Sequence, residues 1–152
     1  MDISITGCPY LVKERNLFLA LAVYSIKLHI PKRYHTEFTL DILFKPPNEM
    51  NDSMGLHHGK DGYHQIEIDR TLNIIDQFQT LSHEIIHMKQ LIKGQLKYLP
   101  NGILWNGNIY TGDDEPWEDE AYKKENEAAM GFTFRLLYDM IDTEDLLNQL
   151  KE

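Results

Sequence analysis

Apolar and polar residues in the first part of the chain predict a helix and then a strand. Residues 10–29 carry apolar side chains at mixed helical spacing, which predicts a mostly buried first helix. Pro31 ends this helix, because proline cannot continue the backbone hydrogen-bond ladder. Residues 36–44 place an apolar side chain at every second position, which is typical of a half-buried strand. These positions are Phe38, Leu40, Ile42 and Phe44.

The next segment is rich in residues that form turns. Residues 48–62 contain Asn, Asp, Ser and three Gly, and they predict a loop with at most a short irregular strand around Gly55. Residues 63–69 alternate again, with His64, Ile66 and Ile68 on one face. This alternation predicts a further strand that pairs antiparallel with a neighbour.

The hydrophobic period then changes from two to between three and four. From Asn73 to Lys93, apolar residues step by four and by three, which predicts a helix with one apolar stripe. Gly94 fits the C-terminal cap of this helix. The stripe consists of Ile74, Phe78, Leu81, Ile85, Met88 and Ile92.

The last third of the chain predicts a hairpin and two helices. The Asn-Gly pair inside residues 103–110 favours a hairpin, because it readily adopts the positive φ angles of a type I′ turn. Pro116 suits the first position of a helix that we expect to reach about Met140. Asp142 or Thr143 could cap a short last helix.

Together these elements predict an α+β fold in one domain spanning residues 1–152. The expected order is an N-terminal helix, a short and mostly antiparallel sheet, a long central helix, a hairpin and a downstream helix. Neither a linker nor an internal repeat interrupts this order.

Composition narrows the compartment and the partners. Of the 152 residues, 42% are hydrophobic and 26% are charged, which excludes a largely disordered chain. The formal net charge of -9 disfavours binding to nucleic acid and to anionic membranes. The longest apolar run, Leu17–Ile26, is about half as long as a bilayer span requires. The chain has a single cysteine, Cys8, which cannot form an internal disulfide. This cysteine usage is typical of a reducing compartment, so we expect a cytoplasmic protein.

The central helix carries the sequence His83-Glu84-Ile85-Ile86-His87, an HExxH motif. Histidines four residues apart project from one helical face, so both imidazoles can reach one metal ion. Zn²⁺ accepts nitrogen and oxygen ligands and lowers the pKa of a bound water toward neutrality. Glu84 is turned away from the ligand line and can act as general base and acid toward that water. The motif therefore predicts zinc-dependent hydrolysis of peptide bonds.

A catalytic zinc usually has a third protein ligand, which must come from another segment. The acidic stretch at the start of the downstream helix offers two carboxylates, Glu118 and Glu120. Helical spacing leads from Glu118 through Tyr122 and Glu125 into an apolar face, whereas Glu120 leads to residues that should face water. We expect Glu118 to point at the central helix, with Glu120 as the alternative ligand.

At these positions the sequence resembles the gluzincins, HExxH metallopeptidases whose third ligand is a glutamate on a downstream helix. The resemblance covers residues 83–87 and 116–122. It implies that Glu118 is a metal ligand and that Ala121 lets two helices approach. Tyr122 departs from the pattern, because the family usually has Asp or Asn there to orient a ligand histidine. The same arrangement is similar to small proteins of phage genomes that are regarded as metallopeptidases.

Stabilising the charge that develops during hydrolysis requires a further hydrogen-bond donor. Tyr110 and Tyr122 could supply it, and both are equally suited to packing in the core. His57, His58 or His64 could also serve, or could help to bind substrate. The sequence alone leaves this choice open.

We expect a peptide or protein substrate that pairs as an added strand with residues 63–69. Two other functions are compatible with the sequence. One is a zinc-binding regulatory or interaction module that cleaves nothing, although such a role does not require Glu84. The other is an acidic interaction protein, in which the HExxH sequence is accidental and residues 113–120 form a contact patch.

Overall fold

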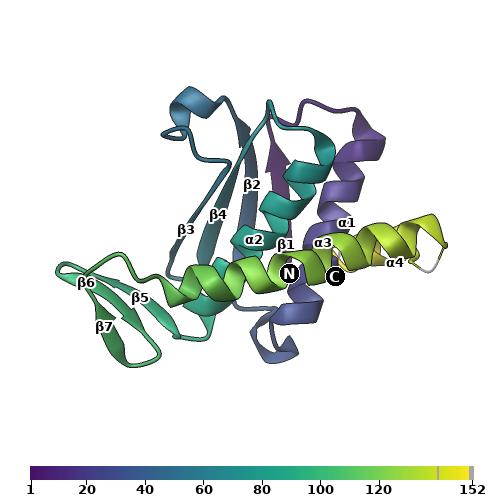
Figure 1. Cartoon of the computed structure of the whole chain (residues 1–152). Coiled ribbons are helices and arrows are strands. Elements are labelled where there is room, and N and C mark those ends of the chain that lie inside the picture. The colour runs from purple at the N-terminus through teal and green to yellow at the C-terminus, as the bar shows by residue number, and fades with distance from the viewer. Residues whose placement is uncertain (140, 151–152) are drawn as a thin grey trace.

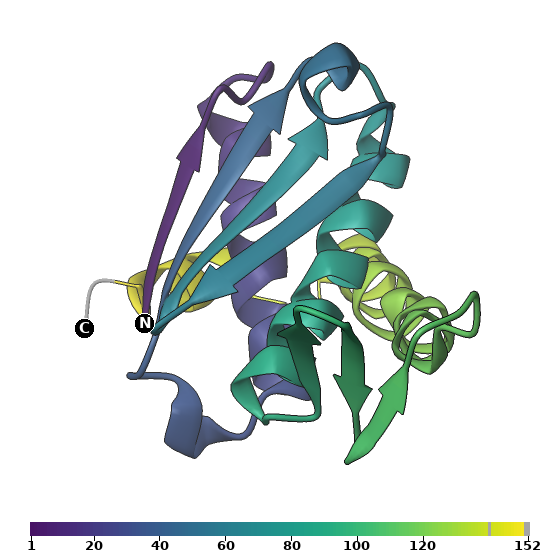
Figure 2. The same cartoon turned by 90° about the vertical axis from the view of Figure 1, so that its left-hand side faces the viewer.

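The computed structural model describes residues 1–139 and 141–150. Four strands form a sheet in the order β1-β2-β4-β3 (Figure 2). β1, β2 and β4 are parallel, and β3 pairs antiparallel with β4 at one edge of the sheet. The strands are β1 (Asp2–Thr6), β2 (Thr39–Lys45), β3 (Gly55–Lys60) and β4 (Tyr63–Asp69).

The expectation of a mostly antiparallel sheet is wrong, because two of its three strand pairings are parallel. A helix returns the chain from β1 to the start of β2, and β3 returns it from β2 to the start of β4. Residues 48–62, expected as a loop, thus contain a regular edge strand. The two-residue turn between β3 and β4 is Asp61-Gly62, with φ angles of 52° and 81°. Strand β1 has no counterpart among the elements predicted from the sequence.

Helices cover one face of this sheet (Figures 1 and 2). They are α1 (Val12–His29), α2 (Ile74–Ile92), α3 (Pro116–Leu137) and α4 (Thr143–Asn148). α2 packs on β3 and β4, α1 packs beside α2, and α3 runs across α2 and contacts both of these helices. The mixture of helices and strands confirms the α+β class.

The main core lies between the sheet and its helices. The predicted alternation of β2 is confirmed, since Leu40, Ile42 and Phe44 are buried and the residues between them are partly exposed. The apolar stripe of α2 enters the same core, with Leu81 and Ile85 completely buried. α2 therefore has one fixed face, and its opposite face is available for chemistry.

A second, three-stranded sheet lies beyond the end of α2 (Figure 1). It is antiparallel and consists of β5 (Leu96–Leu99), β6 (Gly102–Trp105) and β7 (Asn108–Tyr110). The predicted turn at Asn106 and Gly107 is confirmed, because both residues have positive φ angles. A small cluster of Leu96, Trp105 and Trp117 joins this sheet to the start of α3.

The C-terminal helices begin near their predicted positions. α3 starts at Pro116 as expected and ends at Leu137, and the predicted end near Met140 lies outside the described residues. Asp142, rather than Thr143, caps α4, because its carboxylate accepts hydrogen bonds from two backbone N–H groups. Among the described residues, no helix is both long enough and apolar enough to cross a membrane.

Candidate metal centre

The HExxH sequence lies in the middle of α2, with Ile85 in the core and His83 and His87 on the side of the helix that faces α3. The Asn73 side chain caps this helix by accepting a hydrogen bond from the backbone N–H of Asp76. Anchoring by Leu81 and Ile85 fixes the rotation of α2 and turns His83 and His87 toward α3. The sequence thus determines locally which two imidazoles lie together.

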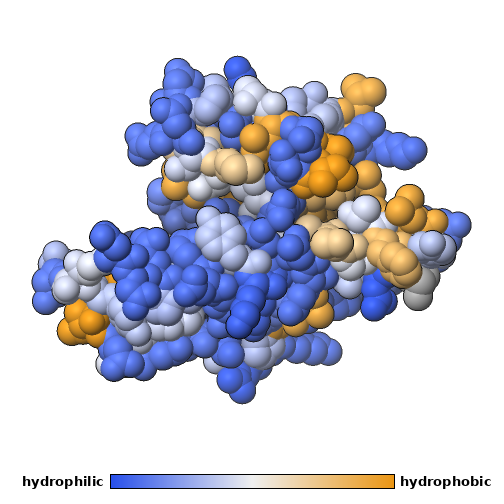
Figure 3. Space-filling model, viewed as in Figure 1, coloured by the Kyte–Doolittle hydropathy of each residue, from blue (hydrophilic) through white to orange (hydrophobic). Residues whose placement is uncertain are grey.

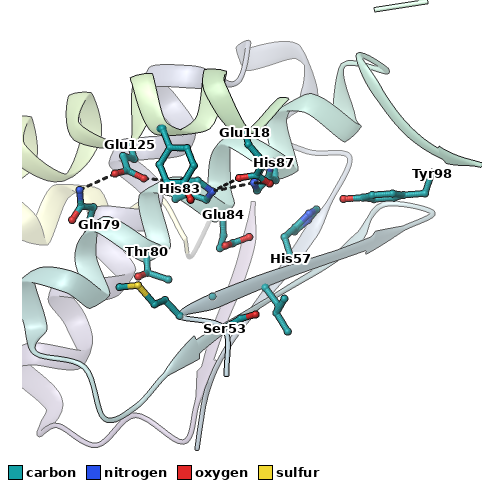
Figure 4. Close-up of a pocket in the computed structure, with 14 residues that line it drawn as sticks. Ser53, His57, Gln79, Thr80, His83, Glu84, His87, Tyr98, Glu118 and Glu125 are labelled. Carbon is teal, nitrogen blue, oxygen red and sulfur yellow. Dashed lines mark hydrogen bonds and ion pairs between the residues drawn. The ribbon is translucent and has the colours of Figure 1, made fainter. Parts of the chain in front are cut away.

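Glu118, in the first turn of α3, meets both histidines (Figure 4). Its two carboxylate oxygens lie 3.1 Å from His83 Nε2 and 3.1 Å from His87 Nε2. The two Nε2 atoms are themselves 3.1 Å apart. The structure therefore brings together two nitrogen atoms and one carboxylate from two helices, a group that could hold a metal ion.

The Nδ1 atom of each imidazole, on the side away from Glu118, also forms a hydrogen bond. His83 Nδ1 donates to a carboxylate oxygen of Glu125 at 2.7 Å. His87 Nδ1 donates to the amide oxygen of Gln90 at 2.9 Å, while the Gln90 amide nitrogen donates to the carbonyl oxygen of Trp117. With Nδ1 protonated, a neutral ring carries its lone pair on Nε2, which is the form that binds a metal.

The converging groups require positive charge between them. Two nitrogen lone pairs and a carboxylate within 3.1 Å of one another repel unless protons or a cation lie between them. Burial alone would lower the pKa values of His83 and His87, but hydrogen bonding to Glu118 raises both. Hydrogen bonds from the same histidines lower the pKa of Glu118 to about 2. Two nitrogens and one oxygen are a donor set that zinc accepts, so the residues fit that ion.

Glu125, rather than the residue at position 122, forms the hydrogen bond to His83 Nδ1. The ring of Tyr122 lies beside His83, with centroids 4.8 Å apart, and offers it no hydrogen bond among the described contacts. Glu125 follows almost one turn later on the same face, and Gln79 holds its second oxygen at 2.8 Å. The spacing of 118, 122 and 125 was the sequence signal for this inward face.

Glu120, the alternative third ligand, contacts a different residue and does not lie beside the two histidines. Its carboxylate forms an ion pair with Lys89, which is only 4% exposed. The amide nitrogen of Gln90 also approaches Glu120 at 3.4 Å. Farther along this side of α3, Glu127 is exposed, as expected. Glu120 itself is partly buried, because the buried ammonium of Lys89 requires a counter-charge there.

Glu84 opens onto the same space from the other side of the histidines (Figure 4). It is 6% exposed, and burial raises the pKa of its carboxyl to about 7. The start of β3 lies against it, because a Cβ atom on Gly55 would come within 2.9 Å of Glu84 Oε1 and 2.4 Å of Thr80 Cγ2. Only glycine allows the strand to pass this close to α2.

These groups line a pocket of about 550 Å³ with walls from α2, α3, β3 and β5. One wall is the edge strand β3. The expectation that residues 63–69 offer a free edge is wrong, because β4 is paired on both sides, with β2 and with β3. An extended peptide could add only to β3 at this side of the sheet.

Side chains that can donate hydrogen bonds also lie beside the pocket. His57 lines it and pairs with His64 behind it, with 3.0 Å between His57 Nε2 and His64 Nδ1. Burial lowers the pKa of His57 to about 3, so its ring is neutral near pH 7. His58 lies apart from this pair, largely exposed, 3.8 Å from a carboxylate oxygen of Glu67.

The two tyrosines considered as hydrogen-bond donors, Tyr110 and Tyr122, lie in different places. Tyr122 lines the pocket. Tyr110 instead packs on the indole of Trp117, with ring centroids 5.8 Å apart. Tyr98 also lines the pocket, although this residue was not among the candidates predicted from the sequence. The position of Tyr98 depends on the direction in which β5 leaves the end of α2. No hydrophobic periodicity in the sequence predicts that direction.

Comparison of the chain with protein-family models, with curated proteins and with solved structures gives no match.

Proposed function

We propose that the protein is a zinc-dependent peptidase in which His83, His87 and Glu118 hold the metal ion. The observation that carries the proposal is the convergence of these three side chains beside the buried carboxyl of Glu84. The resemblance of residues 83–87 and 116–122 to gluzincins supports the same assignment. The ion supplied there would activate water and polarise a carbonyl group.

Glu84 is the proposed general base and general acid. Its carboxylate takes a proton from the attacking water as the water oxygen bonds to the scissile carbonyl carbon. It then returns that proton to the leaving amine as the carbon–nitrogen bond breaks. Burial raises the pKa of this carboxyl to about 7 in the metal-free site, which keeps the group close to the range in which a carboxylate can both accept and return a proton.

The substrate proposed is an extended polypeptide paired with β3. An added strand would satisfy the free backbone groups of this edge and would bring a peptide bond past the histidines. His57, Tyr98 and Tyr122 stand around that position and are the candidate donors to the developing oxyanion. Neutral imidazole and protonated phenol can both donate such a hydrogen bond.

The test compares the wild type with Glu84→Gln, and uses Glu127→Gln on the exposed face of α3 as a matched control. Metal content is measured by mass spectrometry. Hydrolysis is measured by incubating each protein with a pool of proteome-derived peptides. We expect about one zinc per chain in all three proteins. We expect Glu84→Gln to lose about a hundredfold or more in kcat/KM, and Glu127→Gln to retain activity.

The alternative module that binds zinc without hydrolysis makes a different prediction. If the wild type holds zinc but is as inert as Glu84→Gln on the whole pool, the peptidase proposal is overturned and the module is favoured. If the wild type binds no zinc after incubation with the ion, both proposals fail.

A further inference from the structure

Two histidines, His57 on β3 and His64 on β4, contact each other in the sheet wall of the pocket. In the register of these strands Gly59 is opposite His64, and His57 precedes Gly59 by two residues. Residues two apart on a strand point to the same face, so both imidazoles lie on one face of the sheet. That face packs against α2, because Ile66, opposite His57, is buried in the main core.

The two imidazole rings meet edge to edge. His57 Nε2 lies 3.0 Å from His64 Nδ1. The ring planes are within 14° of each other and the centroids are 5.2 Å apart, which is close to the largest separation that such a contact between two imidazoles allows. An N–H of one ring therefore points almost straight at the lone pair of the other. A straight hydrogen bond of this kind fixes the orientation of the His57 ring.

The surroundings of His64 hold this side chain in place. A Cβ atom on Gly59 would come within 2.5 Å of His64 Nδ1, so only glycine leaves room for the histidine pair. The ring of Phe38 packs edge-on against His64, with centroids 6.0 Å apart. Burial lowers the pKa values of both histidines, that of His57 to about 3. Near pH 7 both rings are therefore neutral, and one proton lies between them.

His57 has a second nitrogen that no described residue satisfies. Figure 4 shows its ring projecting from β3 toward α2, on the same side as Glu84. Its Nδ1 atom is buried and forms no hydrogen bond with the described residues. An unpartnered buried nitrogen is unfavourable, and a substrate oxygen would supply the missing partner. When His64 donates to His57 Nε2, the proton of the neutral His57 ring lies on Nδ1, which is then a donor.

The two tyrosines of the pocket lack such support. Tyr98 is 61% exposed and Tyr122 is 63% exposed, and neither hydroxyl forms a hydrogen bond among the described contacts. Figure 3 shows the half of α3 that carries Glu118 as a mostly hydrophilic surface, where water competes for the hydroxyl of Tyr122. Donors that are held in place before the reaction stabilise an oxyanion best. Of the three candidates, His57 is the one that a second side chain holds.

We infer that His57 donates a hydrogen bond to the carbonyl oxygen of the cleaved peptide bond, and that His64 is a positioning residue, which holds the His57 ring for this contact. This inference rests on the proposed peptidase function. The carbonyl oxygen gains negative charge as water attacks, so the donor contributes more in the transition state than in the bound substrate. Loss of the donor should therefore lower kcat and leave KM little changed.

The test measures kcat and KM separately, with a peptide from the pool that the wild type cleaves. His57→Phe keeps a flat ring and removes both nitrogens, and should lower kcat about 10²- to 10³-fold. His64→Leu removes the bond to His57, and should lower kcat about 10- to 100-fold. His64→Asn should recover most of that loss, because its amide carries polar atoms on Cγ, as histidine carries Nδ1.

A double variant separates positioning from a merely structural role. Combining His57→Phe with His64→Leu should cost no more kcat than His57→Phe alone, because His64 acts through His57. His58→Leu changes the neighbouring histidine, whose exposed side chain lies on the other face of β3, and should keep the wild-type kcat. Additive losses, an equal loss in His58→Leu, or a loss in His64→Asn as large as in His64→Leu would overturn the inference.

Zinc content, measured for each variant, separates this inference from other outcomes. We expect about one zinc per chain in all of them. A second zinc in the wild type that His64→Leu loses would make the pair a metal site and would overturn the inference. Hydrolysis by the wild type together with an undiminished kcat in His57→Phe rejects the inference alone. If the wild type cleaves nothing, the peptidase proposal fails, and the inference fails with it.

Discussion

At the scale of single residues, the candidate metal centre depends on groups that never contact the ion. Glu125 and Gln90 occupy the Nδ1 atoms of His83 and His87, and thereby direct both Nε2 lone pairs at Glu118. Such partners fix the tautomer and orientation of a ligand histidine and make it a better ligand. Their loss should weaken metal binding without removing it.

We therefore expect Glu125→Ala to raise the Kd for zinc about 10- to 100-fold. Glu118→Ala should weaken binding more, since it removes one of three donors. Glu127→Ala, on the exposed face of the same helix, is the control and should bind zinc as the wild type does. Competition with a chromophoric chelator measures all three. A wild-type Kd for Glu125→Ala would contradict the orienting role.

The pair of Lys89 and Glu120 makes a prediction about stability rather than metal binding. Glu120→Ala leaves a buried ammonium unpaired and should lower the free energy of unfolding by about 2–4 kcal/mol. Lys89→Met should cost less, because it removes the buried charge and leaves Glu120 partly exposed. Urea unfolding measures both losses. Both variants should bind as much zinc per chain as the wild type. Loss of bound zinc in Glu120→Ala would instead indicate that Glu120 is a ligand.

At the scale of elements, the close approach of β3 to α2 positions the carboxyl of Glu84, the proposed general base. Gly55 lets the edge strand lie against Thr80 and Glu84, and this contact forms one wall of the pocket. A side chain at this position would push either the strand or the carboxyl group away. The packing of β3 on α2 and the proposed activity thus depend on the same backbone position.

Gly55→Ala should therefore lower the free energy of unfolding by about 1–3 kcal/mol through overpacking, and should also lower kcat/KM. Thr80→Ser removes the Cγ2 atom that the new methyl group meets, and its hydroxyl can still donate to the Asp76 carbonyl oxygen. Combining the two substitutions should recover part of the lost stability. A double-mutant cycle by urea unfolding measures this coupling, and strict additivity would contradict the contact.

At the scale of the whole molecule, a metal ion bound at this centre would join two helices that are distant in sequence. α2 anchors the centre in the main core, and α3 carries Glu118 together with the link to the small sheet. Hydrogen bonds and an ion pair from Gln79, Lys89 and Gln90 also join the two helices on either side of this centre. Occupancy should therefore stabilise the folded protein as a unit.

At a free zinc concentration of 100 times Kd, we expect about 2.7 kcal/mol of stabilisation, and a rise in Tm of roughly 5–11 °C for a chain of this size. Glu84→Gln should show the same rise, because its side chain lies outside the donor set. His83→Ala should show none. Calorimetric scans with zinc or with a chelator provide the comparison, and an equal rise in His83→Ala would place the ion elsewhere.

Features that depend on neighbouring residues were readable from the sequence alone. The apolar stripe of α2, the spacing of His83 and His87, the turn at Asn106-Gly107 and the start of α3 all follow from local periodicity and backbone preferences. The inward direction of Glu118 was also predictable, because an amphipathic helix has one buried face. Even β3 had a local signal in Asp61-Gly62, a pair that favours a two-residue hairpin turn.

Only the tertiary structure decided how these elements meet. The parallel pairing of β2 with β4, and hence the edge position of β3, depends on long-range contacts that local patterns do not specify. The same is true of the partner of Glu120 and of the placement of Tyr98. Local chemistry thus determined which residues could act, whereas packing between distant segments determined which of them lie together.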